Sequence, residues 1–463
     1  MRRRLRYNPA MKIKRDMYLG KLIAAKHDGF VKIITGIRRC GKSYLLMKLF
    51  RSHLVMSGVP SNRIIMVDLD DDKNERLRDP RKLSEWVRRR IRSRASRYYL
   101  FIDEIQMCEE VRIDVEGSET KLTFYDVLNG LLKYPKLDIY VTGSNSKMLS
   151  SDIATNFRDR GEEIRLHPLS FAEFRQVVKK DEYSAFREYL VYGGMPLCVL
   201  KRTEPEKRAY LKSLFEKVYL KDVIEHNNVR ERSVLESILD VLSSSVGSLT
   251  NSNKLVQQLN SQQGLKTNSP TVSRQIGYLR DAYLFSKVDR YDVQGKRYLD
   301  YPSKFYCEDV GLRNVRLNFR EFEDAHLMEN VIYNELVARG YAVDVGVVEV
   351  DVKEGGKTMR KQLEIDFVVN TGFNKIYIQS AYALPDQAKR DQETLSLRKS
   401  GDFFKKIVVT AANAPAFEGE DGITYIGVIP FLLDRKFLEG AVLSATREPG
   451  SFPIVKRETG KVG

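Results

Sequence analysis

Residues 31–46, VKIITGIRRCGKSYLL, run from a stretch rich in β-branched side chains, through a glycine-bounded loop, into a leucine-rich amphipathic stretch. Within them, residues 36–43 read GIRRCGKS and fit the pattern GxxxxGK(S/T), after an expected strand and at the start of an expected helix. Such a P-loop encloses phosphates in backbone N–H groups, and the positive end of the helix faces the same anion. The chain is therefore predicted to contain an α/β core that binds ATP. The predicted nucleotide-binding residues are Gly36, Ile37, Arg38, Arg39, Cys40, Gly41, Lys42, Ser43 and Tyr44.

Side chains with catalytic roles are predicted in this loop and after a later strand. The ammonium of Lys42 is expected on the β and γ phosphates, and the hydroxyl of Ser43 on the Mg²⁺ that bridges them. Residues 98–102, YYLFI, read as a buried strand that is followed at once by Asp103 and Glu104. We expect Asp103 to hold the water shell of the metal and Glu104 to polarise the attacking water. The alternative is a strand capped by solvated acids.

A third expected strand, at residues 139–141, is followed by the small polar residues TGSN. Ligands of open α/β folds bind at this edge of the sheet, so a sensor of the γ phosphate is predicted here, with Asn145 favoured over Ser144. An ordinary turn is the alternative. Further on, Arg158 and Arg160 flank an aspartate, and either is a candidate arginine finger, from the same chain or a neighbouring subunit. A solvated charge run is the alternative there.

Length and composition favour a multidomain protein. A chain of 463 residues with 42% hydrophobic residues is long enough for about three domains with proper cores. It contains no CxxC pair, which argues against a zinc cluster and for a reducing compartment. Neither a signal-like apolar stretch nor a run of about 18 apolar residues occurs, so a cytoplasmic protein without membrane contact is expected. The four cysteines are Cys40, Cys108, Cys198 and Cys307.

The net charge of +16 suits a polyanionic partner such as DNA. The excess is spread along the chain and includes the run EWVRRRIRSRASR at residues 85–97. Solvated helix faces are the alternative reading of these charges.

The middle of the chain, residues 233–288, reads as successive short helices followed by two strands. Asn268 or Ser269 can cap the last of these helices, and Pro270 fits its first turn. We expect Leu255, Val256, Leu259, Val272, Ile276, Leu279 and Tyr283 to form the apolar faces and Ser273, Arg274 and Arg280 to face outward. A turn at residues 294–295 would complete a winged helix-turn-helix, which binds DNA in some proteins and serves as a protein-interaction spacer in others.

Five segments together resemble one known family. GIRRCGKS, LFIDEIQ, VTGSNSKML, PLSFAEF and YLVYGGMP look like the prokaryotic AAA+-type ATPases that carry a C-terminal domain of unknown function. The resemblance implies an α/β, multidomain fold with a doubly wound parallel sheet, and it favours a homo-oligomer. The implied domains are an ATPase core at 1–175, a small helical region at 176–230, a winged-helix-like domain at 231–310 and a nuclease-like α/β domain at 311–463.

The last domain resembles the PD-(D/E)XK nucleases, with two departures. Glu329 on an expected helix, Glu364 or Asp366 in a strand and Gln379 in the next strand fall at the positions of the metal site. Neutral Gln379 replaces a carboxylate, and Ala381 replaces the lysine that orients water. The remaining carboxylates would bind Mg²⁺ weakly and activate water poorly, so we expect binding without cleavage.

Two functions of different classes follow from these patterns. The first is a Mg²⁺-dependent ATPase that couples hydrolysis to conformational change and acts on DNA or RNA. The second is a nucleotide-controlled switch that binds a protein partner, in which case the positive charge is incidental.

Overall fold

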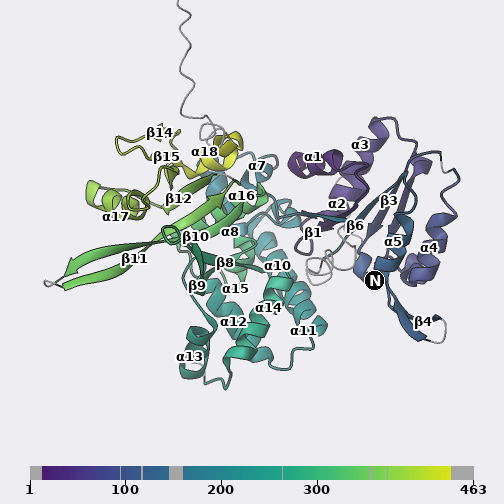
Figure 1. The fold of residues 1–463 in the computed structure, drawn as a ribbon, viewed down its shortest axis with the longest axis horizontal. Coiled ribbons are helices and arrows are strands. Elements are labelled where there is room, and N and C mark those ends of the chain that lie inside the picture. Colours follow the sequence, from purple (N-terminus) through teal and green to yellow (C-terminus); the bar gives the residue numbers. More distant parts are fainter. Residues whose placement is uncertain are drawn as a thin grey trace, which may run out of the picture. The chain divides into compact units, whose positions relative to one another are not determined.

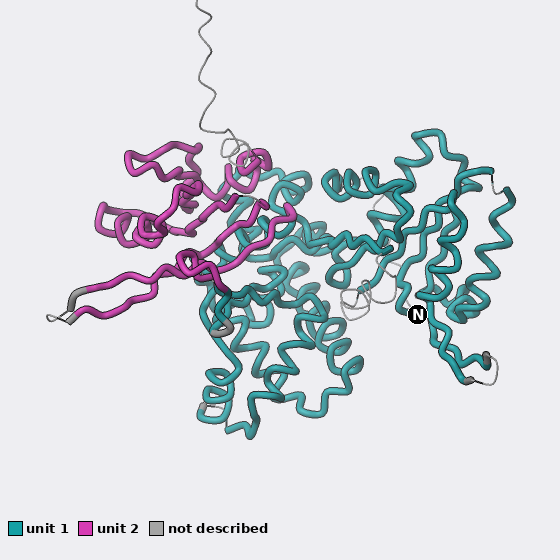
Figure 2. The backbone as a smooth tube through the Cα atoms, viewed as in Figure 1, with its two compact units in different colours: residues 1–290, 298–338 teal, residues 291–297, 339–463 magenta. Residues whose placement is uncertain are grey.

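The computed structural model describes residues 13–93, 95–115, 118–144, 160–262, 264–354, 357–372 and 374–439 (Figure 1). The chain divides into two compact units (Figure 2). Unit 1 comprises Met1–Arg290 and Tyr298–Ala338, and unit 2 comprises Tyr291–Arg297 and Arg339–Gly463. The finer division of the chain into four domains stays a prediction.

Unit 1 contains a five-stranded parallel sheet in the order β2-β3-β6-β1-β7. Its central strands are buried along their whole length, as their runs of aromatic and β-branched residues predict. The strands are β1 (Val31–Thr35), β2 (Ile64–Asp68), β3 (Tyr98–Asp103), β6 (Leu137–Thr142) and β7 (Gly161–Arg165). An α/β fold with a parallel central sheet is therefore confirmed.

Helices cover both faces of this sheet, because alternate strand residues point to opposite sides. On one face, Leu100 and Ile102 belong to an apolar cluster with residues of α4 (Pro80–Arg88) and α5 (Phe124–Leu131). On the other face, Phe101 packs against Phe50 with ring centroids 5.6 Å apart. Phe50 belongs to the continuous helix that follows the P-loop, which consists of α2 (Lys42–Tyr44), the π-helical turn η1 (Leu45–Phe50) and α3 (Arg51–Met56).

Short elements complete this part of unit 1. They are α1 (Asp16–Ala24), the 3₁₀ turns η2 (Ser61–Arg63), η3 (Asp72–Arg78) and η4 (Ile105–Met107), and the antiparallel pair β4 (Val111–Val115) and β5 (Ser118–Leu122).

The rest of unit 1 is mainly helical. Its first group comprises α7 (Phe171–Phe174), α8 (Glu182–Tyr192), α9 (Pro196–Val199), α10 (Glu204–Leu214), η6 (Phe215–Leu220) and α11 (Lys221–His226). Its second group comprises α12 (Arg232–Ser244), α13 (Ser252–Gln262), α14 (Ser269–Asp281), most of β8 (Phe285–Asp292) and of β9 (Arg297–Cys307), α15 (Val310–Arg316) and α16 (Asp324–Ala338).

The predicted start and inner face of α14 are confirmed. The Asn268 side chain caps the helix by accepting a hydrogen bond from the N–H of Thr271 at 2.9 Å, and Pro270 occupies the first turn. A single antiparallel bridge joins Thr250, before α13, to Ser303 of β9. Of the predicted apolar residues, Val256 is half-buried, and the buried ones are Leu255, Leu259, Val272, Ile276, Leu279 and Tyr283.

Unit 2 is built on a mixed sheet in which β12, β13 and β15 are parallel and β10, β11 and β12 are antiparallel. Among the strands that lie entirely in this unit, the order is β14-β15-β13-β12-β11-β10. The hairpin tip at residues 291–297 belongs to the same unit, because the N–H of Val293 donates to the carbonyl of Val347 at 3.0 Å. The elements are β10 (Ala342–Glu354), β11 (Lys357–Asn370), β12 (Lys375–Ala381), α17 (Gln387–Arg398), β13 (Lys405–Thr410), β14 (Phe417–Glu418), β15 (Thr424–Gly427) and α18 (Val428–Leu433).

Candidate ATP site

A cavity of about 360 Å³ lies at the carboxyl ends of β1, β2 and β3 in unit 1. The P-loop lines it from Arg38 to Tyr44, and the predicted acids Asp103 and Glu104 line it too. The structure therefore brings these predicted residues together at the sheet edge where open α/β folds bind ligands. The lining residues that the sequence reasoning missed are Ile13, Arg15, Asp68, Asp70, Leu169, Pro196, Leu197 and Leu200.

Both glycines of the loop have backbone conformations that a side chain would strain. Gly36 has φ 130°, and a Cβ there would lie 2.1 Å from the carbonyl oxygen of Leu166. Gly41 has φ 109° and directly precedes the helix that begins at Lys42. The loop can therefore turn back over the helix start only with glycine at these two positions.

Lys42 is 4% exposed and lies inside the loop. Its ammonium donates to the carbonyl oxygen of Gly36 at 2.9 Å and to that of Ile37 at 3.3 Å. Both acceptors are neutral, so the positive charge of Lys42 is not neutralised by them. An anion such as a phosphate would be strongly attracted to this position.

Asp103 lies at the end of β3 and is 5% exposed. The Thr142 hydroxyl donates to its carboxylate at 2.5 Å, and the Ser43 hydroxyl is a second donor. Burial raises the pKa of Asp103, while these two hydroxyl groups oppose the increase. A carboxylate beside a serine hydroxyl is an oxygen donor set that fits Mg²⁺.

Glu104 follows Asp103 in a left-handed conformation, with φ 52° and ψ 54°. Its N–H donates to the Thr142 hydroxyl at 3.0 Å. Its carboxylate accepts a hydrogen bond from Ser144 at 3.3 Å and another from Gln106. These contacts fix the Glu104 side chain, and they bring Ser144, one of the two predicted sensor residues, into the site.

The other predicted site residues have different outcomes. Asn145 and Arg158 lie outside the described residues. Arg160 is exposed immediately before β7 and does not line the cavity. Its role as an arginine finger stays a prediction.

The P-loop backbone is attached to the helical part of unit 1. Arg38 forms an ion pair with Asp222 of α11, and the Tyr219 hydroxyl of η6 donates to the Arg38 carbonyl at 2.6 Å. On the other side of the loop, the buried guanidinium of Arg15 donates to the Cys40 carbonyl at 3.2 Å. Arg15 also forms an ion pair with Glu173 at 3.0 Å, and both of these side chains are buried.

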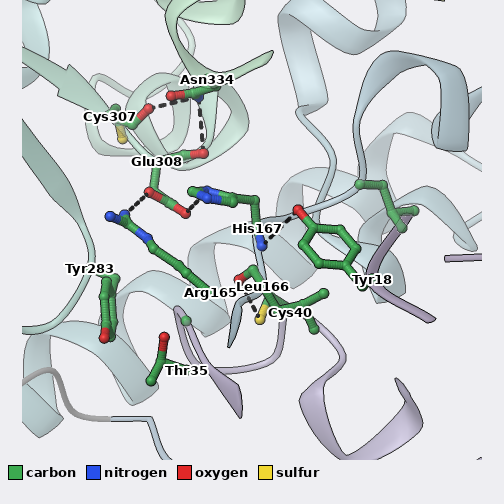
Figure 3. A network of polar contacts seen from close by, with 12 residues as sticks. Tyr18, Thr35, Cys40, Arg165, Leu166, His167, Tyr283, Cys307, Glu308 and Asn334 are labelled. Carbon is green, nitrogen blue, oxygen red and sulfur yellow. Dashed lines mark hydrogen bonds and ion pairs between the residues drawn. The ribbon is translucent and has the colours of Figure 1, made fainter. Parts of the chain in front are cut away.

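Figure 3 shows a second polar network next to the loop, centred on Glu308. The Glu308 carboxylate accepts from Arg165 at 2.7 Å and contacts Nδ1 of His167 at 2.7 Å. The backbone between these two residues also contacts the loop, because the Cys40 thiol donates to the Leu166 carbonyl at 3.3 Å. The end of β7 therefore connects the P-loop to the segment before α15.

The PLSFAEF and YLVYGGMP segments contact each other directly. The N–H of Leu169 donates to the carbonyl of Gly194 at 2.8 Å, and the N–H of Gly194 donates to Asp309 at 2.6 Å. A Cβ at Gly194 would lie 2.1 Å from the Leu169 carbonyl oxygen. The two segments are therefore packed too closely for a larger residue.

The predicted nuclease-like residues are divided between the two units. In unit 1, Glu329 accepts hydrogen bonds from Lys304 at 2.8 Å and from Tyr306 at 2.6 Å. In unit 2, the side-chain oxygen of Gln379 accepts from the N–H of Asp366 at 3.4 Å, and the Asp366 carboxylate accepts from the N–H of Ser380 at 2.9 Å. Glu364, also in unit 2, is half-buried, and Ala381 is buried.

Comparison with known proteins agrees with the P-loop geometry. Residues 28–175 match the family described as an AAA domain, and residues 183–323 match a domain of unknown function. An uncharacterized protein of Haemophilus influenzae is 32% identical over 426 residues, which cover 91% of this chain and 98% of that protein. This chain belongs to the same family. The AAA-domain protein is also 27% identical to an uncharacterized protein of Methanocaldococcus jannaschii over 445 residues, 90% of each chain.

Solved structures similar to this AAA-domain protein include a Walker-type ATPase of Pyrococcus abyssi, with 16% identity and a TM-score of 0.44, covering 66% of this chain and 96% of that one. The ORC2 protein of Aeropyrum pernix is 12% identical, with a TM-score of 0.35, and the coverage is 65% and 90%. Among the described residues of the AAA-domain protein, no helix has both the length and the apolar character needed to cross a membrane. The match of residues 28–175 to the AAA domain confirms the predicted P-loop core of the AAA type at the level of the domain.

Proposed function

We propose that this AAA-domain protein hydrolyses ATP with Mg²⁺ and couples hydrolysis to movement of the helices around the P-loop. The observation that carries the proposal is one cavity that holds Lys42, Ser43, Asp103 and Glu104. A buried ammonium, a hydroxyl beside a carboxylate, and a second, fixed carboxylate are the groups that phosphoryl transfer to water requires.

Each of these groups has a definite task in the proposed reaction. Lys42 exchanges its loop carbonyl partners for phosphate oxygens. Ser43 and Asp103 would hold Mg²⁺, which would neutralise charge on the phosphates. Glu104 orients the attacking water and accepts its proton. Ser144, which donates to Glu104, keeps that carboxylate in place and can respond to a change at the γ phosphate.

Coupling follows from the attachments of the loop. Nucleotide binding that shifts the backbone at Arg38 would pull on Asp222 and Tyr219, because both contact that residue. A shift at Cys40 would act on Arg15 and on the Leu166 carbonyl. Helices on both sides of the cavity therefore have polar contacts that can change with the state of the nucleotide.

Two substitutions test the ATPase proposal. Lys42→Ala should abolish turnover and weaken ATP binding, because it removes the cation expected on the phosphates. Glu104→Gln should keep binding and lower the turnover rate by on the order of 10²-fold or more, so that ATP stays bound. Lys82→Ala, which removes an exposed lysine outside the cavity, is the matched control. Turnover retained in both site variants would refute the assignment.

We further propose that the protein acts on DNA. Support comes from the net charge of +16 and from the order of α12, α13, α14 and the β8–β9 hairpin, which is that of a winged helix. Arg274 and Arg280 are exposed on α14 and would face the major groove. The ATPase rate should increase with duplex DNA and the increase should fade at higher salt. A rate indifferent to DNA favours the alternative, a nucleotide-controlled switch with a protein partner.

A further inference from the structure

A second cavity in unit 1, of about 610 Å³, lies at the opposite edge of the parallel sheet from the P-loop. It is lined by the first residues of β2 and by Tyr98, the first residue of β3, so it faces the amino ends of these strands. We call it the arginine pocket. Its lining residues are Arg51, Ser61, Asn62, Arg63, Ile64, Ile65, Met66, Trp86, Arg89, Arg90, Arg92, Ser96 and Tyr98.

The described lining of the arginine pocket carries charge of one sign. Among the described lining residues, five are arginines and none is an aspartate or glutamate. Arg89 pairs with Glu85, but both side chains of that pair are mostly exposed, and such surface pairs contribute little. Burial lowers the pKa of Arg90, and the nearby positive charge of Arg76 lowers it further. Positive charge is thus concentrated here, and the part of the lining that the structure describes contains no matching carboxylate.

The convergence of these arginines does not follow from the periodicity of one helix. Arg51 begins α3, Arg63 ends η2, and Arg89, Arg90 and Arg92 follow α4. Three separate chain segments therefore contribute arginines to the lining of one cavity, and a bound anion would reduce the repulsion between their charges. Solvation of a single charged helix face does not account for this arrangement.

We propose that the arginine pocket binds the phosphate backbone of a nucleic acid. Guanidinium groups donate two parallel hydrogen bonds to a phosphate, and Ser61, Asn62 and Ser96 in the lining are further donors of the type that contacts phosphate and sugar oxygens. Since the pocket and the ATP cavity lie at opposite edges of the sheet, both ligands can be bound at once. The arginine pocket is separate from both the ATP site and α14, and its role as a contact surface rests on the proposed action on DNA.

The only tryptophan of the protein, Trp86, provides the measurement. Its ring lines the pocket and is stacked under the Arg90 guanidinium, which lies 3.6 Å from the ring centroid. Titration of the full-length protein with a 20-base-pair duplex should change the Trp86 fluorescence in a saturable manner. With three to five phosphates contacted, affinity should fall on the order of 100-fold between 50 and 200 mM salt.

Matched variants locate the binding surface. Arg63→Gln/Arg89→Gln/Arg92→Gln should weaken duplex binding at least tenfold and make the slope of log affinity against log salt shallower by about 2 to 3. The control Arg112→Gln/Arg320→Gln/Arg360→Gln removes the same charge from exposed sites outside the pocket and should change affinity less than threefold. The single variant Arg92→Gln, with an exposed side chain, should give an intermediate loss.

Further variants and ligands distinguish duplex binding at the arginine pocket from binding elsewhere on the protein. The double variant Arg274→Gln/Arg280→Gln on α14 should retain the Trp86 fluorescence change. ATPase activity without DNA should be normal in the pocket variants, so loss of DNA binding and loss of hydrolysis are distinguishable. Equal losses in the pocket and control variants would overturn the inference. So would a fluorescence change with polyglutamate or inorganic phosphate but none with the duplex.

Discussion

The buried Glu308 carboxylate offers the sharpest test of how unit 1 is stabilised. Glu308→Gln keeps the side-chain volume but removes the negative charge from between Arg165 and His167, which contact it at 2.7 Å each. Removing one partner of a buried ion pair typically costs about 3–5 kcal/mol. The Arg165 side chain is 30% exposed and can regain some hydration. We therefore expect a loss near the lower end, about 3 kcal/mol of unfolding free energy at neutral pH.

The same substitution predicts a change in pH dependence. Burial alone would raise the pKa of Glu308, but Arg165 and His167 outweigh it and hold the pKa below its ordinary value. Because the folded pKa is lower than the unfolded one, the ionised carboxylate stabilises the fold above the unfolded pKa. That stabilisation is lost as the pH falls through the folded pKa. The difference in unfolding free energy between the wild type and Glu308→Gln should therefore become smaller below about pH 4.

Urea unfolding followed by Trp86 fluorescence measures this effect in the correct unit, since Trp86 and Glu308 both belong to unit 1. The control is Glu85→Gln, which removes the exposed partner of Arg89 and should cost less than about 1 kcal/mol. Two results would refute the role assigned to this carboxylate. One is a loss of unfolding free energy below about 1 kcal/mol for Glu308→Gln, and the other is a wild-type advantage that stays the same at acid pH.

Three further outcomes are expected. Gly194→Ala should destabilise unit 1 by about 3 kcal/mol in the same urea unfolding assay, because its Cβ would collide with the Leu169 backbone. An unchanged urea midpoint would contradict this close approach. If Arg160 acts on a neighbouring subunit, mixing Arg160→Ala with Lys42→Ala should restore part of the ATPase activity, whereas constant activity on dilution and no rescue would argue against it. Duplex DNA should stay intact with Mg²⁺ or Mn²⁺, and cleavage that disappears in Asp366→Ala would show an active nuclease.

The sequence predicts those parts of the site that are formed by residues close together along the chain. The P-loop, the strand that ends at Asp103 and the cap at Asn268 each follow from a few consecutive residues, and the structure has them where the patterns indicate. Asp68 in IIMVDLD could have been found in the same way, as an acid at the end of an apolar strand.

Such patterns do not predict contacts between segments that lie far apart in the sequence. Arg15 reaches the P-loop and pairs with Glu173, which lies far along the chain, and nothing near Arg15 in the sequence indicates either contact. The same holds for Arg165 and Glu308, which are 143 residues apart. Gly36 fits the P-loop pattern, yet the atom that a side chain there would meet first is the Leu166 carbonyl oxygen, just after β7. Side-chain periodicity reports which face is buried but not which partner is found there.

The position of Lys42 has a consequence for the P-loop when no nucleotide is bound. Its ammonium already has two carbonyl acceptors within the loop. A departing phosphate therefore does not leave an unsatisfied buried cation behind, and an arriving one gains only the difference between phosphate and carbonyl as partners. The empty loop therefore keeps the lysine hydrogen-bonded, while the charge of Lys42, which neutral carbonyls do not balance, still favours the return of a phosphate.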